Sequence, residues 1–97
     1  MSNFRQPAGV VPQVTQVATF QSTLADINNS LKLGLIDNGG IANSLSHKIQ
    51  AAENASGPAR NNVLNAFKNE VNAQSDKHIT GIAPQVLLAD ANSLRGQ

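Results

Sequence analysis

Apolar residues recur every third or fourth position over most of this chain, from about residue 14 to residue 94. Such a period places apolar side chains on one face of an α-helix. Four stretches carry the period, and short segments rich in glycine, asparagine, serine and proline separate them. No stretch keeps the alternation of a β-strand beyond a few residues. We therefore predict an all-α domain, a compact four-helix bundle-like array with short inter-helix turns.

The four apolar stripes also predict the core. We expect a first helix of about 20 residues through residues 17–31 and a second helix through residues 41–52. The third helix should run from Pro58 to near residues 75–77, and the fourth should follow Thr80 and extend to residue 94. Leu64 is expected to lie beside the stripe of the third helix. The side chains predicted to be buried are Val17, Phe20, Leu24, Ile27, Leu31, Ile41, Leu45, Ile49, Val63, Phe67, Val71, Leu87 and Leu94.

Turn-forming residues separate the first two predicted helices. Gly34 suits the left-handed position that ends the first helix. Four polar and glycine residues then predict a turn, and one of its first two residues should cap the second helix. Leu35 and Ile36 are expected to anchor this turn against the core. The turn residues are Asp37, Asn38, Gly39 and Gly40.

Similar signals mark the last two predicted helices. Pro58 suits the first position of the third helix, directly after a cap at Ser56 or Gly57. Ile79 follows the third helix as a single apolar anchor. Thr80 is predicted to cap the fourth helix, because its hydroxyl can accept a hydrogen bond from a free amide of the first turn.

The first 13 residues lack any sustained period and include Pro7, Gly9 and Pro12. We interpret residues 1–13 as a flexible arm or linker remnant, and residues 14–97 as a single four-helix module. The chain shows no export signal, which leaves two expectations open. It is either cytosolic or a piece of a longer exported protein.

Composition narrows the possible partners. Only 13% of the residues are charged, about half the usual share, and the net charge is +1 with no run of Lys or Arg. Nucleic acid is therefore not expected as a partner. No apolar stretch approaches the roughly 18 residues that a membrane span needs. The absence of cysteine excludes disulfides and Cys-ligated zinc, and the absence of Trp and Tyr argues against a stacking platform for sugars.

Asp90 is the candidate buried polar residue. It lies three residues after Leu87 and four before Leu94, so its carboxylate should face the core. An unpaired charge there would be costly. We expect Asp90 to accept hydrogen bonds from backbone amides of an inter-helix turn, at residues 37–41 or 78–81, and so to tie that turn to the bundle. A catalytic role is the less favoured interpretation.

Other chemically capable residues favour structural explanations. His47 should face water and His78 should lie in the last turn, so neither predicts a metal site, and no cofactor is expected. Ser44 and His47 are neighbours on a helix surface but lack an orienting acid. Residues 37–40 lack the spaced oxygen ligands of a calcium loop. The polar side of the third helix, from Arg60 to Glu70, is expected to be a solvated face rather than a DNA-recognition surface.

Four ordered segments carry a family resemblance. They are residues 34–45 (GLIDNGGIANSL), residues 64–75 (LNAFKNEVNAQS), residues 77–80 (KHIT) and residues 87–94 (LLADANSL). Together they resemble the FIMAH-type domain, a helical module found near the C-termini of multidomain secreted or surface proteins of bacteria. The resemblance covers roughly residues 16–95. Asp76 stands where members often have a glycine that would suit a left-handed helix end, and Arg95 stands where an apolar residue is expected.

The resemblance implies a non-catalytic accessory interaction or spacer module, part of a longer secreted or cell-surface chain, with a protein or cell-envelope partner. The alternative is a free-standing cytosolic adaptor that binds a partner helix or a second copy of itself. That alternative would use apolar residues outside the main stripes as an exposed patch. The residues are Leu33, Leu35, Ile36, Val86 and Leu88.

Overall fold

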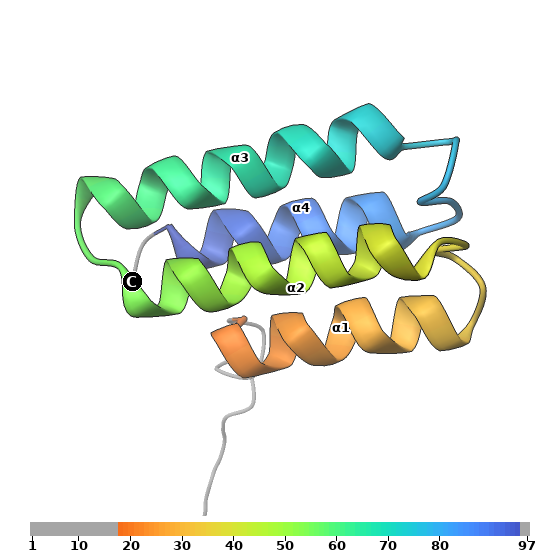
Figure 1. Cartoon of the computed structure of the whole chain (residues 1–97), viewed down its shortest axis with the longest axis horizontal. Coiled ribbons are helices and arrows are strands. Elements are labelled where there is room, and N and C mark those ends of the chain that lie inside the picture. The colour runs from red at the N-terminus through yellow and green to blue at the C-terminus, as the bar shows by residue number, and fades with distance from the viewer. Residues whose placement is uncertain (1–17, 96–97) are drawn as a thin grey trace, which may run out of the picture.

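Four antiparallel helices make up the part of the chain that the structure describes (Figure 1). The computed structural model describes residues 18–95, and its helices are α1 (Phe20–Lys32), α2 (Gly39–Asn54), α3 (Pro58–Gln74) and α4 (Ala83–Leu94). Each helix packs against the next one along the chain, and α4 packs back against α1 to close the array. The all-α prediction is confirmed. The predicted arm over residues 1–13 and the predicted core residue Val17 lie outside the described residues.

The core follows the predicted stripes, with one shift on α3. Seven of the predicted side chains are fully buried, whereas Phe20, Leu24, Leu31, Ile41 and Val63 pack at its margin and are half-buried. The buried stripe of α3 runs through Leu64 rather than through Val63. Leu64 precedes Val71 by almost two full helical turns and so lies in line with it, whereas Val63 is turned by roughly 80° from that line. The seven are Ile27, Leu45, Ile49, Phe67, Val71, Leu87 and Leu94.

Side-chain caps begin the first two helices. Thr19 and Ser22 form a capping box at the start of α1, in which each side chain accepts a hydrogen bond from the other residue's backbone amide, at 2.9 Å and 2.8 Å. Asn38 is the N-cap of α2, and its Oδ1 accepts from the Ile41 amide at 3.1 Å. Of the two predicted candidates, Asp37 and Asn38, it is therefore Asn38 that caps the helix. Gly39, predicted as a turn residue, already belongs to α2.

Glycines occupy the backbone positions that were predicted for them at two helix ends. Gly34 has a φ of +80° and follows Leu33, the C-cap of α1, as the left-handed end requires. Gly57, with a φ of +58°, is the N-cap of α3, so Ser56 is not the cap, and Pro58 is the first helical residue. Gly39 and Gly40 lie in the first turn of α2. The prediction that residues 37–40 form a four-residue turn before the helix is therefore wrong. The Asn38 cap starts the helix early enough to include both glycines.

The prediction that Thr80 caps α4 is wrong. α4 begins at Ala83 after Ile82, without a side-chain cap. The Thr80 amide donates to the Leu35 carbonyl at 2.7 Å, and its hydroxyl donates to the same oxygen at 3.3 Å. The hydroxyl is therefore used in a contact with the α1–α2 connection instead of at the helix start.

That contact is part of a pairing between two connections, residues 33–38 and 75–82, which lie at the same end of the bundle (Figure 1). Ile36 and Ile79 form an antiparallel β-bridge, and the Asp37 amide donates to the His78 carbonyl at 3.0 Å. Both isoleucine side chains are completely buried. The predicted anchoring of the turns by Ile36 and Ile79 is confirmed, and we call these segments the paired connections.

Asp76 offers a test of backbone strain within the paired connections. Its φ is 66°, the left-handed conformation, which an aspartate adopts at some cost and glycine adopts freely. We expect Asp76→Gly to stabilise the protein by about 0.5–1 kcal/mol, measured by urea denaturation. Lys77→Gly is the matched control, because Lys77 has no positive φ and the added backbone freedom should destabilise the protein. A loss of stability in Asp76→Gly would contradict the strain argument.

Candidate functional site

Asp90 does not make the contact predicted for it. Its side chain is half-buried and lies near the side chain of Asp26 on α1, instead of accepting from the amides of a turn. The buried stripe of α4 is Ala83, Leu87, Ala91 and Leu94, so Asp90 lies at the edge of the stripe that faces α1. Its Oδ2 atom is buried and receives no hydrogen bond from an amide or hydroxyl group within residues 18–95.

This environment favours a protonated carboxyl group. Burial raises the pKa of Asp90 to about 8, and the nearby carboxyl group of Asp26 adds to the increase. At neutral pH the Asp90 carboxyl group is therefore largely protonated. Two carboxyl groups that share a proton can serve as an acid–base pair in an enzyme. Here the pair lies in the contact between two helices, where it can hold or release a proton.

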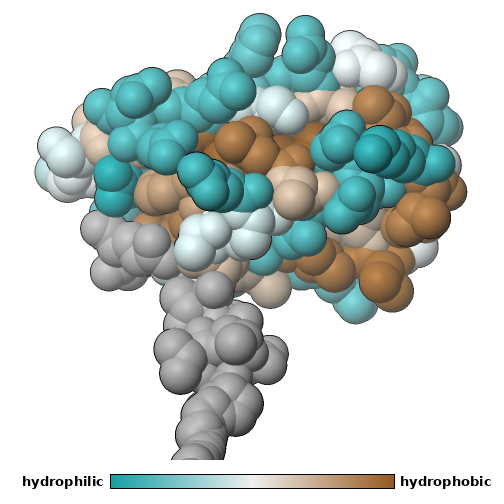
Figure 2. Space-filling model, turned by 90° about the horizontal axis from the view of Figure 1, so that it is seen from below, coloured by the Kyte–Doolittle hydropathy of each residue, from teal (hydrophilic) through white to brown (hydrophobic). Residues whose placement is uncertain are grey.

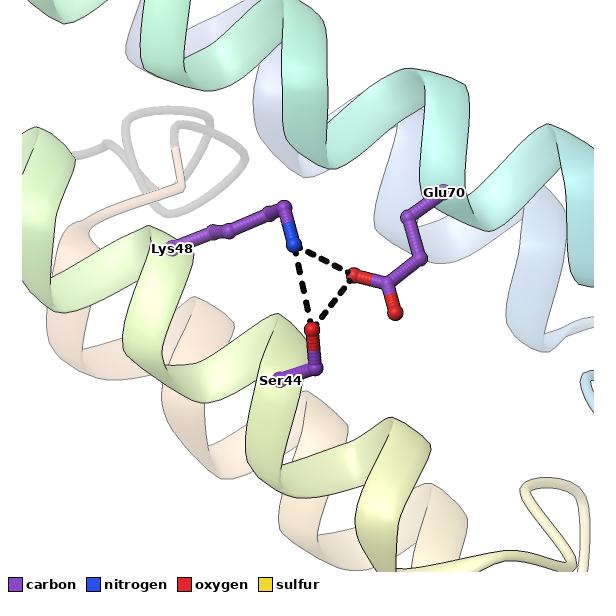
Figure 3. A network of polar contacts seen from close by, with 3 residues as sticks. All are labelled: Ser44, Lys48 and Glu70. Atoms are coloured by element: carbon purple, nitrogen blue, oxygen red, sulfur yellow. Dashed lines mark hydrogen bonds and ion pairs between the residues drawn. The ribbon is translucent and has the colours of Figure 1, made fainter.

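A second polar cluster joins α2 to α3 (Figure 3). Lys48 Nζ donates to Glu70 Oε1 at 2.9 Å and to Ser44 Oγ at 3.0 Å, and Ser44 Oγ donates to the same Glu70 oxygen at 3.0 Å. Ser44 is thus next to a cation that donates to it rather than next to a base. The geometry ties the two helices together and does not activate the hydroxyl as a nucleophile. The sequence predicted Ser44 and His47 as neighbours but did not indicate this cluster, because Glu70 lies on another helix.

The energy of this tie can be measured by a double-mutant cycle. Lys48 and Glu70 are 32% and 19% exposed, so their attraction is stronger than at an open surface but still screened. We expect a coupling free energy of about 0.5–1.5 kcal/mol between Lys48→Met and Glu70→Gln in urea denaturation. Lys68→Met combined with Glu70→Gln is the control pair, since Lys68 binds Asn92 instead. Additive effects of Lys48→Met and Glu70→Gln would contradict the tie.

A shallow depression of about 430 Å³ lies beside this cluster. One face of α2, from Gly40 to Ala51, forms most of it, and Val63 of α3 closes one side. His47 lines it and is exposed to solvent, as the sequence predicts. The depression is open rather than enclosed, unlike the deep pockets that bury most of a small ligand.

His78 lies in the paired connections, where the sequence places it. Its Nδ1 is 2.7 Å from Asp37 Oδ1, and both side chains are about half exposed. Asp37 therefore joins the two connections through its side chain as well as through its amide. Within residues 18–95, no three His, Asp or Glu side chains lie close enough together to hold a metal ion.

The polar side of α3 is not only a solvated face. Arg60 Nε donates to the Ala52 carbonyl at 2.9 Å, and its guanidinium lies 4.8 Å from the centre of the Phe20 ring. Lys68 Nζ donates to Asn92 Oδ1 of α4 at 2.9 Å. The free carbonyls at the C-terminus of α2 need donors, and no basic residue in the last turn of α2 supplies one. This need for donors could have indicated from the sequence that Arg60 binds the end of α2, but the prediction did not include it.

Exposed apolar side chains mark the end of the bundle that carries the paired connections. Leu33 is 75% exposed and Ile82 is 65% exposed, and each comes from a different connection. Figure 2 shows hydrophobic side chains gathering at the right-hand end of the molecule, which is this end. Of the patch residues suggested by the sequence, Ile36 is buried and Leu35, Val86 and Leu88 are half-buried. The patch is thus smaller than expected and includes Ile82, which the sequence analysis left out.

Comparison with models of known protein families gives no match, and neither do comparisons with curated proteins and with solved structures. The resemblance to the FIMAH-type domain stays a prediction. In the part of the chain that the structure describes, no helix is both long enough and apolar enough to span a bilayer.

Proposed function

We propose that the protein is a non-catalytic accessory module that mediates an interaction or acts as a spacer within a longer secreted or cell-surface bacterial protein. Its contact surface is the end formed by the paired connections, and its partner is a protein or a component of the cell envelope. The resemblance to FIMAH-type domains supports the setting. The observation that carries the proposal is the exposure of Leu33 and Ile82 on a fixed backbone at that end.

The direction of the chain agrees with this role. α1 begins and α4 ends at one end of the bundle, and the paired connections lie at the opposite end (Figure 1). A module that is joined to neighbouring segments through both of its chain termini presents the other end of the bundle, which carries the paired connections, to its surroundings. The bridge between Ile36 and Ile79 holds that end in shape, so less conformational entropy is lost when a partner binds.

The reading frame that encodes the chain tests the accessory role. We expect the frame to continue into an export signal and further modules. A stop codon followed by a ribosome-binding site immediately before the codon for Met1 would contradict this role.

The exposure of Leu33 and Ile82 also supports a second candidate, a cytosolic adaptor that binds another copy of itself. Light scattering over a concentration series separates the two candidates. A monomer at all concentrations supports the accessory module. A dimer that is lost in the double variant Leu33→Ser, Ile82→Ser supports the adaptor, because serine removes the apolar contact and leaves the buried core intact.

A further inference from the structure

Asn38 and Gly39 form the one Asn–Gly pair of the chain, although asparagine occurs throughout the sequence. The pair lies at the start of α2, where Asn38 is the N-cap and Gly39 is the first helical residue. Both residues are exposed to solvent. Asn38 directly follows Asp37, whose amide and side chain both contact His78, so the pair adjoins the contact that joins the paired connections.

A glycine after an asparagine permits a reaction that other residues hinder. The backbone nitrogen of the glycine can attack the side-chain carbonyl carbon of the asparagine, because glycine has no Cβ to obstruct the approach and its backbone turns freely. The fold adds no obstruction of its own, since a Cβ placed on Gly39 would meet no atom within 4 Å. The amide of a first helical residue also has no acceptor within its own helix. The Gly39 nitrogen is therefore an accessible nucleophile.

The N-cap geometry opposes this attack while the cap is formed. Asn38 has a ψ of 115°, the extended backbone of a cap, which turns the Gly39 nitrogen away from the Asn38 side chain. Asn38 Oδ1 accepts from the Ile41 amide at 3.1 Å, and the Asn38 carbonyl accepts from the Ala42 amide at 3.1 Å. Both hydrogen bonds must break before the peptide between Asn38 and Gly39 can rotate. Opening of a helix end takes much less free energy than global unfolding, so the cap slows the attack without preventing it.

We propose that Asn38 is the principal site of spontaneous deamidation in this chain, with the Gly39 nitrogen as the nucleophile when the α2 cap opens. The Gly39 N–H loses its proton to hydroxide, and its nitrogen forms a bond to Asn38 Cγ. The bond from Cγ to the side-chain nitrogen breaks, that nitrogen takes up a proton, and ammonia leaves. Water then opens the cyclic imide at one of its two carbonyl carbons. Attack at Cγ gives aspartate, and attack at the main-chain carbonyl gives isoaspartate, in which the backbone runs through the former side chain.

The two products differ in their effect on the fold. Aspartate in place of Asn38 keeps an oxygen that can accept from the Ile41 amide, and its negative charge suits a helix N-terminus. Isoaspartate adds a carbon to the backbone between Asp37 and Gly39, which displaces the groups that start α2. Asp37 joins His78 through its amide at 3.0 Å and through its side chain at 2.7 Å. Isoaspartate should therefore loosen the paired connections, whereas aspartate should leave them in place.

Incubation of the full chain at mildly alkaline pH, followed by peptide mapping with mass spectrometry, tests the proposed site. We expect the peptide that contains Asn38 to gain the mass difference between an amide and a carboxylic acid, and to separate into an aspartate form and an isoaspartate form. Asn43 is the internal control, because it is also exposed on α2 but is followed by Ser44. Gly39→Ala is the matched variant, since its Cβ finds open space in the fold and yet hinders the nitrogen. It should slow conversion of Asn38 at least about tenfold. Equal conversion of Asn38 and Asn43, or an unchanged rate in Gly39→Ala, would overturn the site.

Two further measurements test the role of the cap and the effect of the products. Conversion of Asn38 should be faster in urea that unfolds the chain, because the cap no longer holds its backbone; an equal rate in the folded protein would overturn the role of the cap. Hydrogen exchange of the Asp37 amide reports on the paired connections. Asn38→Asp should keep the protection of this amide, and the isolated isoaspartate form should lose it at least about tenfold. Unchanged protection in the isoaspartate form would overturn the proposed loosening.

Discussion

Replacing Phe67 with alanine is expected to remove a large share of the stability of the protein, about 3–5 kcal/mol. Phe67 lies in the middle of α3, is completely buried and is the largest of the fully buried side chains among residues 18–95. Truncation of a buried phenylalanine typically costs about 3–5 kcal/mol, and a small domain has a total stability of about 5–15 kcal/mol. The fraction folded in increasing urea, followed by circular dichroism, measures the loss.

Val63→Ala is the matched control for this variant, because Val63 lies on the same helix but is only half-buried. We expect it to cost about 1 kcal/mol, since fewer apolar contacts are lost and the space left behind opens toward solvent. Equal losses in the two variants would place Val63 in the core, as the sequence analysis did, and would contradict the observed position of the α3 stripe.

Replacing Ile79 with alanine should destabilise the protein by about 2–5 kcal/mol, although Ile79 lies outside every helix. The side chain is completely buried and belongs to the bridge that joins the paired connections. Its truncation leaves a cavity in the core and weakens the pairing between the α1–α2 and α3–α4 connections. Urea denaturation measures the loss, and we expect it to approach that of a core residue on a helix.

Ile82→Ala is the control, because it makes the same change three residues further along the same connection at a side chain that is 65% exposed. We expect a change within about 0.5 kcal/mol. If Ile79→Ala were as mild as Ile82→Ala, the paired connections would contribute little to stability, and the rigid end on which the proposed function depends would lose its support.

The helices and most of their buried faces could be predicted because the apolar period is a local property of the sequence. Gly34, Asn38 and Pro58 likewise act on their immediate neighbours, and their positions were predicted correctly. The pairing of the two connections could not be predicted in this way. Asp37 and His78 are 41 residues apart, and Thr80 and Leu35 are 45 apart. Thr80 fits a helix cap by local rules, yet it serves this distant contact instead.

Asp90 shows a second limit of predicting buried positions from the apolar period. Neighbouring residues on a helix are separated by about 100°, so a displacement of one position decides between the buried stripe and its edge. The small Ala91 takes the buried position, and Asp90 points to α1. Its neighbour Asp26 could not be identified from sequence, because their proximity depends on how α1 and α4 pack. The Lys48–Glu70 tie escaped prediction for the same reason.

The size and location of the native polypeptide test the proposed accessory role most directly. An antibody raised against residues 18–95 can be used to probe cell-envelope, secreted and cytosolic fractions of the source organism. We predict a band well above the 10.2 kDa of this chain, in the envelope or secreted fraction. A band near 10.2 kDa confined to the cytosol would contradict the accessory module and would favour the free-standing adaptor.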